Sequence, residues 1–179
     1  MINVRTIAPA LLAATLVAMP PAVQAQQADP IRDELLSQFQ MSMRKFIALA
    51  NAMPAEKFTW SPGEGVMEVG HVFMHVARYN YGYPSGNMGA ALPAGVELET
   101  MESVRDKDAV VRALQASHAW VTGVVAGMDE ASLGTQTRLY GREMERWGVL
   151  VQLVAHMNEH LGQSIAYARM NGVVPPWSR

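Results

Sequence analysis

Apolar residues recur every three to four positions along four long segments of this 179-residue chain, and this period limits the fold more than any other feature. It is the period of an amphipathic α-helix, which buries one face against its neighbours. No segment shows the sustained alternation of a half-buried strand, and no internal repeat is visible. The sequence therefore predicts an all-α domain, and four helices with long connections favour a four-helix bundle.

Capping residues, prolines and glycines mark the ends of the predicted helices. Asp29-Pro30 places an N-cap side chain before a proline of the first turn, whereas Asn171-Gly172 followed by Pro175-Pro176 is a strong stop signal. The segment from Pro84 to Glu99 is rich in Gly, Pro and Ala, and loops of that length are uncommon unless they serve a site. We expect helices at about 30–53, 67–83, 103–128 and 142–170, with irregular connections between them.

The first 25 residues have the pattern of an export signal. Arg5 is their only charged residue, residues 7–18 form an apolar stretch, and Val23-Gln24-Ala25 offers small residues at the two positions that a signal peptidase inspects. The stretch is shorter than the roughly 20 residues of a membrane-spanning helix, which makes an uncleaved anchor the lesser alternative. We expect cleavage after Ala25, no membrane association afterwards, one domain over residues 26–179, and a periplasmic or secreted location.

The composition excludes several classes of function. Fourteen Lys and Arg residues stand against sixteen Asp and Glu residues with no basic run, so neither nucleic-acid binding nor a basic membrane-surface patch is predicted. The chain contains no cysteine, which excludes disulfides, thiolate metal sites and a cysteine nucleophile. Any metal ion would have to be held by His, Asp or Glu side chains.

Four of the five histidines form two pairs spaced by four residues, His71 with His75 and His156 with His160. This spacing places both members of a pair on one helical face, where they can donate two nitrogens to one metal ion. If the second helix packs beside the fourth, His75 comes to lie opposite the other pair and completes a site with positions open for water or substrate. The alternative is a set of buried imidazoles hydrogen-bonded to neighbours. The fifth, His118, lies in the apolar stripe of the third helix and is expected to be a core or edge residue.

Short motifs are spread over nearly all of the chain after the export segment. They are Trp60-Ser61-Pro62, Val69-Gly70-His71, His75-Val76-Ala77 with Tyr79-Asn80-Tyr81, and Ala155-His156, Glu159-His160-Leu161-Gly162-Gln163 and Tyr167-Ala168-Arg169 with Gly172 and Pro175-Pro176. Together they resemble the DinB/YfiT family. The most specific part is the C-terminal run, which joins a His-x-x-x-His-x-Gly-Gln pattern to a Tyr-x-Arg and a Gly-x-x-Pro-Pro ending.

The resemblance implies a four-helix bundle that holds a divalent metal ion, nickel or zinc, with one histidine of the second helix and two of the last. Carried over by position, these ligands are His75, His156 and His160, because His75 precedes the Val-Ala and aromatic-Asn stretches as the family's histidine does. His71 is an additional residue that is either an extra ligand, an alternate ligand or a partner of one. Family members are commonly dimeric, so a homodimer is among the implied assemblies.

The implied function is a metal-dependent enzyme that acts on a small-molecule substrate. The ion would lower the pKa of a bound water or bind a substrate thiolate or oxygen as a Lewis acid, which leaves hydrolysis and thiol transfer open. Export argues against thiol transfer, since low-molecular-weight thiols are mainly cytosolic. Glu68 and Tyr167 are the weak candidates for catalysis. The alternative function is a non-enzymatic exported bundle for metal sequestration or sensing.

Overall fold

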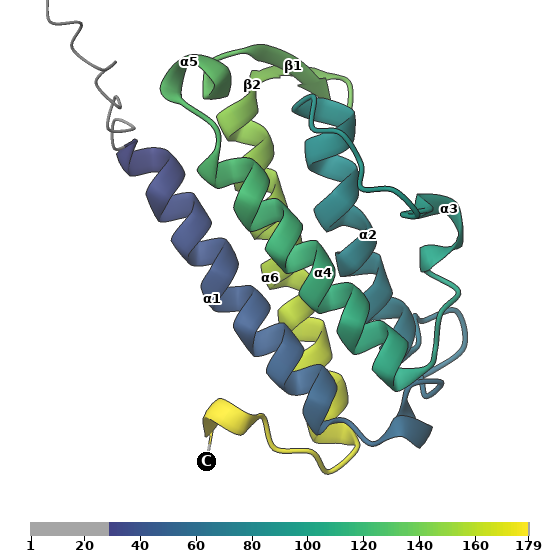
Figure 1. Cartoon of the computed structure of the whole chain (residues 1–179). Helices are drawn as coiled ribbons and strands as arrows, with labels where there is room; N and C mark the ends of the chain where they lie inside the picture. Colours follow the sequence, from purple (N-terminus) through teal and green to yellow (C-terminus); the bar gives the residue numbers. More distant parts are fainter. Residues whose placement is uncertain (1–28, 179) are drawn as a thin grey trace, which may run out of the picture.

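The computed structural model describes residues 29–178, so the predicted export segment lies outside the described residues. Four long helices dominate the structure (Figure 1), and the shorter elements lie between and after them. The long helices are α1 (Pro30–Ala52), α2 (Val69–Asn87), α4 (Lys107–Ala126) and α6 (Arg146–Met170). The shorter elements are η1 (Ala55–Lys57), α3 (Leu98–Met101), α5 (Glu130–Leu133), β1 (Gln136–Leu139), β2 (Arg142–Glu145) and η2 (Pro176–Ser178).

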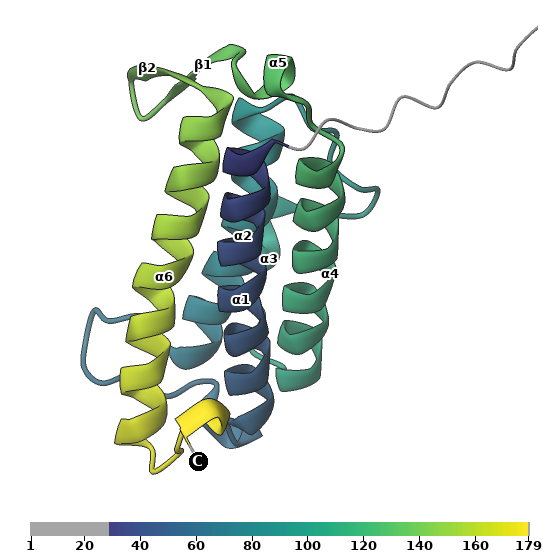
Figure 2. The same ribbon diagram turned by 90° about the vertical axis from the view of Figure 1, so that its left-hand side faces the viewer.

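The four long helices form a bundle in which α1 and α6 run in one direction and α2 and α4 in the other (Figures 1 and 2). Each of them packs against two others: α1 and α2 both contact α4 and α6. The consecutive helices α1 and α2 therefore occupy opposite corners of the bundle. This order makes α2 and α6 antiparallel neighbours, as a histidine site shared by these two helices requires.

The first helix begins at Pro30 as predicted, whereas the third begins at Lys107 rather than near Ser103, so the predicted start of the third helix was wrong. The Asp29 carboxylate accepts hydrogen bonds from the backbone N–H groups of Ile31 and Arg32, and Asp106 accepts one from Ala109. These bonds satisfy N–H groups that the first turn of a helix leaves without partners. Within residues 29–178, no helix combines the length and the apolar character needed to cross a membrane.

The core lies along the axis of the bundle and is built from all four long helices. Phe73 of α2 packs edge-on against Phe46 of α1 at 5.7 Å between ring centroids, and it lies 5.8 Å from Phe58, which precedes α2. All three rings are buried, and burying a side chain of this size contributes about 1.5–3 kcal/mol. The core also contains polar contacts, among them a hydrogen bond that the amide of Asn80 donates to Ser117 Oγ at 3.0 Å.

The second helix continues past the proline that was expected to stop it. It ends at Asn87 rather than near Tyr83, so this prediction was wrong. Pro84 lies in the last turn, where its missing N–H removes a single hydrogen bond. The carbonyl of Pro84 accepts from Met88, and the Ser85 hydroxyl donates to the carbonyl of Tyr81, so the backbone around the proline stays bonded.

A small β-hairpin replaces part of the predicted third connection and the start of the last helix. β1 pairs antiparallel with β2, and α6 begins at Arg146 rather than at Arg142. Both turn residues have positive φ, 51° at Tyr140 and 78° at Gly141, as a two-residue hairpin turn requires. The expectation of an all-helical chain was wrong here, whereas the helical bundle itself is confirmed.

Candidate metal centre

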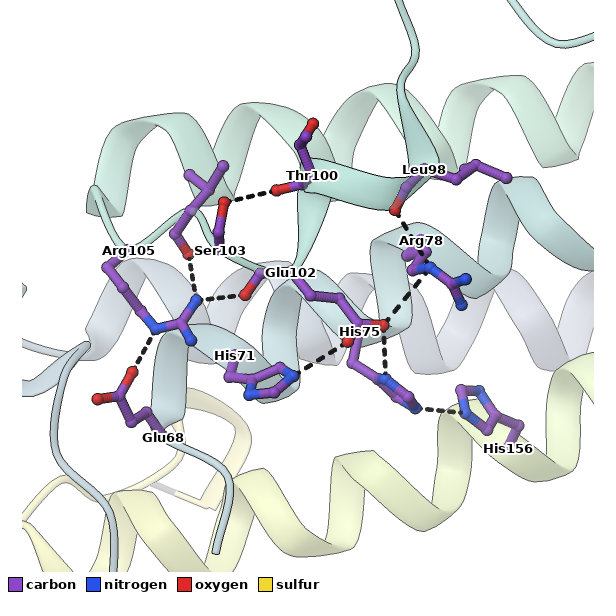
Figure 3. A network of polar contacts seen from close by, with 11 residues as sticks. Glu68, His71, His75, Arg78, Leu98, Thr100, Glu102, Ser103, Arg105 and His156 are labelled. Carbon is purple, nitrogen blue, oxygen red and sulfur yellow. Dashed lines mark hydrogen bonds and ion pairs between the residues drawn. The ribbon is translucent and has the colours of Figure 1, made fainter. Parts of the chain in front are cut away.

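Three histidines converge between α2 and α6. His75 Nε2 lies 3.2 Å from His156 Nε2 across the interface, and Figure 3 shows the two rings facing each other. The ring of His160 lies 4.8 Å from that of His75 and 4.6 Å from that of His156, measured between centroids. One nitrogen from each of the three histidines lies within 4.8 Å of the other two.

The packing of the helices explains this convergence. His156 and His160 are one turn apart on α6 and so share a face. His75 reaches them from α2, the antiparallel neighbour of α6. All three rings are largely withdrawn from water, with His160 only 9% exposed and the His75 side chain 15% exposed.

The donor set fits a divalent transition metal ion. Two nitrogens bound to one ion at about 2.1 Å lie roughly 3.0–3.4 Å apart for angles between a right angle and the tetrahedral angle. The 3.2 Å separation of His75 and His156 falls in this range. Imidazole nitrogens suit zinc and nickel, and three protein ligands leave coordination positions open.

Hydrogen bonds at the far side of the ring fix His160. Its Nδ1 lies 2.8 Å from the side-chain oxygen of Gln163, which can only accept, so Nδ1 carries the hydrogen and Nε2 presents its lone pair. The Gln163 amide then donates to the hydroxyl of Tyr167 at 2.8 Å. Tyr167 packs edge-on against Trp60, which connects this chain of contacts to the segment before α2.

Burial favours the neutral form of two of these histidines, His75 and His156. Burial, reinforced by repulsion from His160 and His75, lowers the pKa of His156 to about 4. Burial also lowers the pKa of His75, against the opposing effect of the Glu102 carboxylate. Because only the neutral imidazole binds a metal ion, burial prepares both rings for that role.

His71 lies beside this triad rather than within it. Its Nε2 is 3.0 Å from Glu102 Oε2, while the other oxygen of the same carboxylate is 2.9 Å from His75 Nδ1. Burial acts to raise the pKa of Glu102, but contacts with His71, His75 and Arg78 lower it overall. His71, His75 and Glu102 thus form a second group with metal-ligand chemistry.

Sequence reasoning missed Glu102. It follows the short helix α3 in the long connection before α4, and no spacing motif singles it out. The available signal was indirect, because a long loop in a compact domain often serves a site.

Tyrosine rings cover the triad on the side of the hairpin. Tyr79 lies 4.6 Å from the rings of both His75 and His156, and Tyr83 meets His156 edge-on at 5.6 Å. The hydroxyls of Tyr83 and Tyr140 are 2.6 Å apart, so the hairpin turn is tied to this aromatic cover. Burial and the contact with Tyr140 raise the pKa of Tyr83, which therefore stays a neutral phenol.

Comparisons with known proteins show which family the chain belongs to. A model of the DinB family matches residues 23–179. The chain belongs to the DinB family. This confirms the resemblance found in the sequence. None of the curated proteins compared with this DinB-family chain matches it.

Several solved structures share the fold of this DinB-family chain. A DinB-like protein from Bacillus cereus ATCC 10987 superposes with a TM-score of 0.71 at 16% identity, covering 80% of this chain and 95% of that one. YfiT from Bacillus subtilis is described as a probable metal-dependent hydrolase with an unusual four-helix bundle topology. It superposes with a TM-score of 0.64 at 14% identity, covering 84% of this chain and 93% of that one. The DinB-like protein YjoA from Bacillus subtilis superposes with a TM-score of 0.54 at 15% identity, covering 78% of this chain and 92% of that one. At these identities the likeness establishes the fold alone.

The other predicted site residues of the DinB-family chain have different surroundings. Glu68 forms an ion pair with Arg105 and makes no side-chain cap at the start of α2. Tyr167 contacts the triad indirectly, through Gln163. His118 is on α4, where its ring lies 5.8 Å from Phe39 and burial lowers its pKa. Glu68 and Tyr167 therefore have structural partners, and both stay predictions as catalytic groups.

Proposed function

We propose that this DinB-family chain is a metal-dependent hydrolase of a small-molecule substrate, with one nickel or zinc ion held by His75, His156 and His160. The observation that carries the proposal is the convergence of three imidazole rings from two antiparallel helices. The description of YfiT as a probable metal-dependent hydrolase with the same fold supports it.

An ion in this site supplies Lewis-acid chemistry, which activates water and polarises a bound carbonyl or similar group. His75 and His160 would contribute their Nε2 lone pairs, His156 would contribute a third ring nitrogen, and Gln163 holds His160 in the required orientation. Tyr79 and Tyr83 cover the triad with ring surface and exclude water from that side. Substrate is thereby directed to the side of the triad that the tyrosines leave free.

Export is part of the proposal and favours hydrolysis over thiol transfer. The pattern of residues 1–25 supports cleavage after Ala25 and a location outside the cytoplasm. Water is abundant there, whereas low-molecular-weight thiols are mainly cytosolic. Cell fractionation and the mass of the mature chain test this part: a mature protein that begins at Gln26 supports it, and a full-length cytosolic protein contradicts it.

The decisive experiment is elemental analysis of the tag-free mature protein, purified without chelator, beside a His156→Ala/His160→Ala double variant. We expect about one nickel or zinc ion per chain in the wild type and none in the folded variant, whose helicity is checked by circular dichroism. A panel of esters, amides and lactones then tests turnover before and after chelation. Metal binding without any metal-dependent hydrolysis would point instead to sequestration or sensing, and a folded wild type that takes up no metal would overturn the proposal.

A further inference from the structure

We propose that Glu102 is a positioning residue of the metal centre, which fixes His75 in the tautomer and orientation that direct its Nε2 to His156 and His160. The inference rests on the proposed function, because it assigns a role in metal binding. It concerns a residue of the loop between α2 and α4 rather than of the helices that carry the histidines.

The hydrogen bond between Glu102 and His75 decides the tautomer. A carboxylate can only accept, so the 2.9 Å contact requires that His75 Nδ1 carry the hydrogen. A neutral imidazole has one N–H group, and Nε2 is therefore left as a lone pair. This nitrogen is the one that lies 3.2 Å from His156 Nε2. Carboxylates that bind the outer nitrogen of a ligand histidine in this way orient the ring and increase its basicity.

Glu102 is itself held in place from several directions, as Figure 3 shows. His71 occupies the second carboxylate oxygen at 3.0 Å, and Arg78 Nε lies 3.7 Å from the first. Arg105 donates to the backbone carbonyl of Glu102 and pairs with Glu68 at the start of α2. The loop is thus attached to α2 on both sides of the carboxylate, which gives Glu102 a defined position.

The same network gives His71 a role. His71 belongs to the support of Glu102, because its Nε2 is directed to the carboxylate and not to the triad. The competing arrangement is a second metal ion bound by His71, His75 and Glu102. It would require His75 to lose its Nδ1 hydrogen, and it would give two ions per chain instead of one.

The first test measures the tautomer without metal. Long-range proton–nitrogen NMR spectra of the metal-free protein near neutral pH distinguish an imidazole protonated at Nδ1 from one protonated at Nε2. We expect His75 to be protonated at Nδ1 in the wild type and to become a mixture in Glu102→Ala. Protonation at Nε2 in the wild type, or an unchanged pure tautomer in Glu102→Ala, would overturn the inference.

The second test measures binding of Co²⁺ and Zn²⁺ by competition with a chelator. We expect Glu102→Ala to weaken the affinity by about 10–100-fold, and Glu102→Gln, which keeps an acceptor oxygen, by less. Glu99→Gln is the matched control, since Glu99 is an exposed residue of the adjacent α3, and its affinity should stay within about twofold of the wild type. Thermal unfolding of the metal-free variants confirms that each is folded.

The outcomes separate this inference from the proposed function. Wild-type affinity in Glu102→Ala, or two ions per wild-type chain, overturns the role of Glu102 and leaves the triad intact. A folded wild type that binds neither Co²⁺ nor Zn²⁺ overturns both. One ion in the wild type, weaker binding in Glu102→Ala and partial rescue in Glu102→Gln support both.

Discussion

His75 and His156 face each other from antiparallel helices with their Nε2 atoms 3.2 Å apart. Without a bound cation, one of these nitrogens must donate a hydrogen to the other, because two lone pairs repel at this distance. The Glu102 contact assigns the His75 hydrogen to Nδ1, so His156 Nε2 is the donor in the metal-free protein. Binding of a metal ion at His156 Nε2 would require this hydrogen to move to Nδ1 of the same ring.

The two histidines of α2 should behave differently when each is replaced. His75→Gln removes a nitrogen of the triad, and we expect at least a 100-fold loss of Zn²⁺ affinity. His71→Gln removes only a contact of Glu102, and a loss of about tenfold or less is expected. Isothermal titration of both variants with Zn²⁺ measures the two losses of affinity. Equal losses would mean that His71 is a ligand.

Replacing Gln163 should loosen His160. Gln163→Leu leaves the His160 Nδ1 hydrogen without its acceptor, and we expect metal affinity to fall about tenfold. Tyr167→Phe is the control, because it removes the hydroxyl beyond Gln163 but keeps the aromatic packing. Its affinity should change by less than about threefold in the same competition assay. A larger effect in Tyr167→Phe would show that the tyrosine acts on the site directly.

The metal-free protein should lose stability in mild acid. An unfolded histidine takes up a proton near pH 6.5, whereas the pKa of His156 in the folded protein is about 4, so protons favour the unfolded chain between these values. Stability attributable to this ring is present above about pH 6.5 and is lost as the pH falls toward 4. The full shift corresponds to about 3 kcal/mol, which solvent screening of this partly exposed ring reduces to about 2 kcal/mol. Urea unfolding of wild type and His156→Gln measures the difference. An identical pH dependence in the variant would contradict the assignment.

Two alanine substitutions in the same helix should have opposite effects on stability. A Cβ at Gly70 would lie 2.9 Å from the Arg105 side chain and 3.0 Å from the Phe58 carbonyl, so Gly70→Ala should destabilise by about 1–3 kcal/mol. A Cβ at Gly82 meets no atom within 4 Å, and Gly82→Ala should stabilise by about 0.5–1 kcal/mol because alanine favours the helix. Thermal unfolding measures both. An unchanged stability in Gly70→Ala would show that the segment before α2 can shift to accommodate the added Cβ.

The sequence was informative where function depends on regular spacing. The four-residue separation of His156 and His160 placed both on one face, and the antiparallel packing of α2 and α6 brings His75 to them. Metal binding by these residues stays a prediction. Glu102 could not be found in this way, since its position depends on contacts with Arg78 and Arg105 that no local pattern encodes.

The errors in the fold have local causes. Strands of four residues are too short to show an alternating pattern, and the Tyr140-Gly141 turn has only its glycine as a signal. Pro84 predicts the end of a helix because the sequence does not reveal that this proline lies in the last turn, where one lost hydrogen bond is tolerated.

The corner positions of α1 and α2 affect when the site can assemble during synthesis. His75 and His156 are 81 residues apart, and α6 is the last long helix to leave the ribosome. A chain that has folded only α1, α2 and α4 holds His71, His75 and Glu102 but lacks both histidines of α6. The proposed three-histidine site would therefore be complete only after α6 has packed against α2.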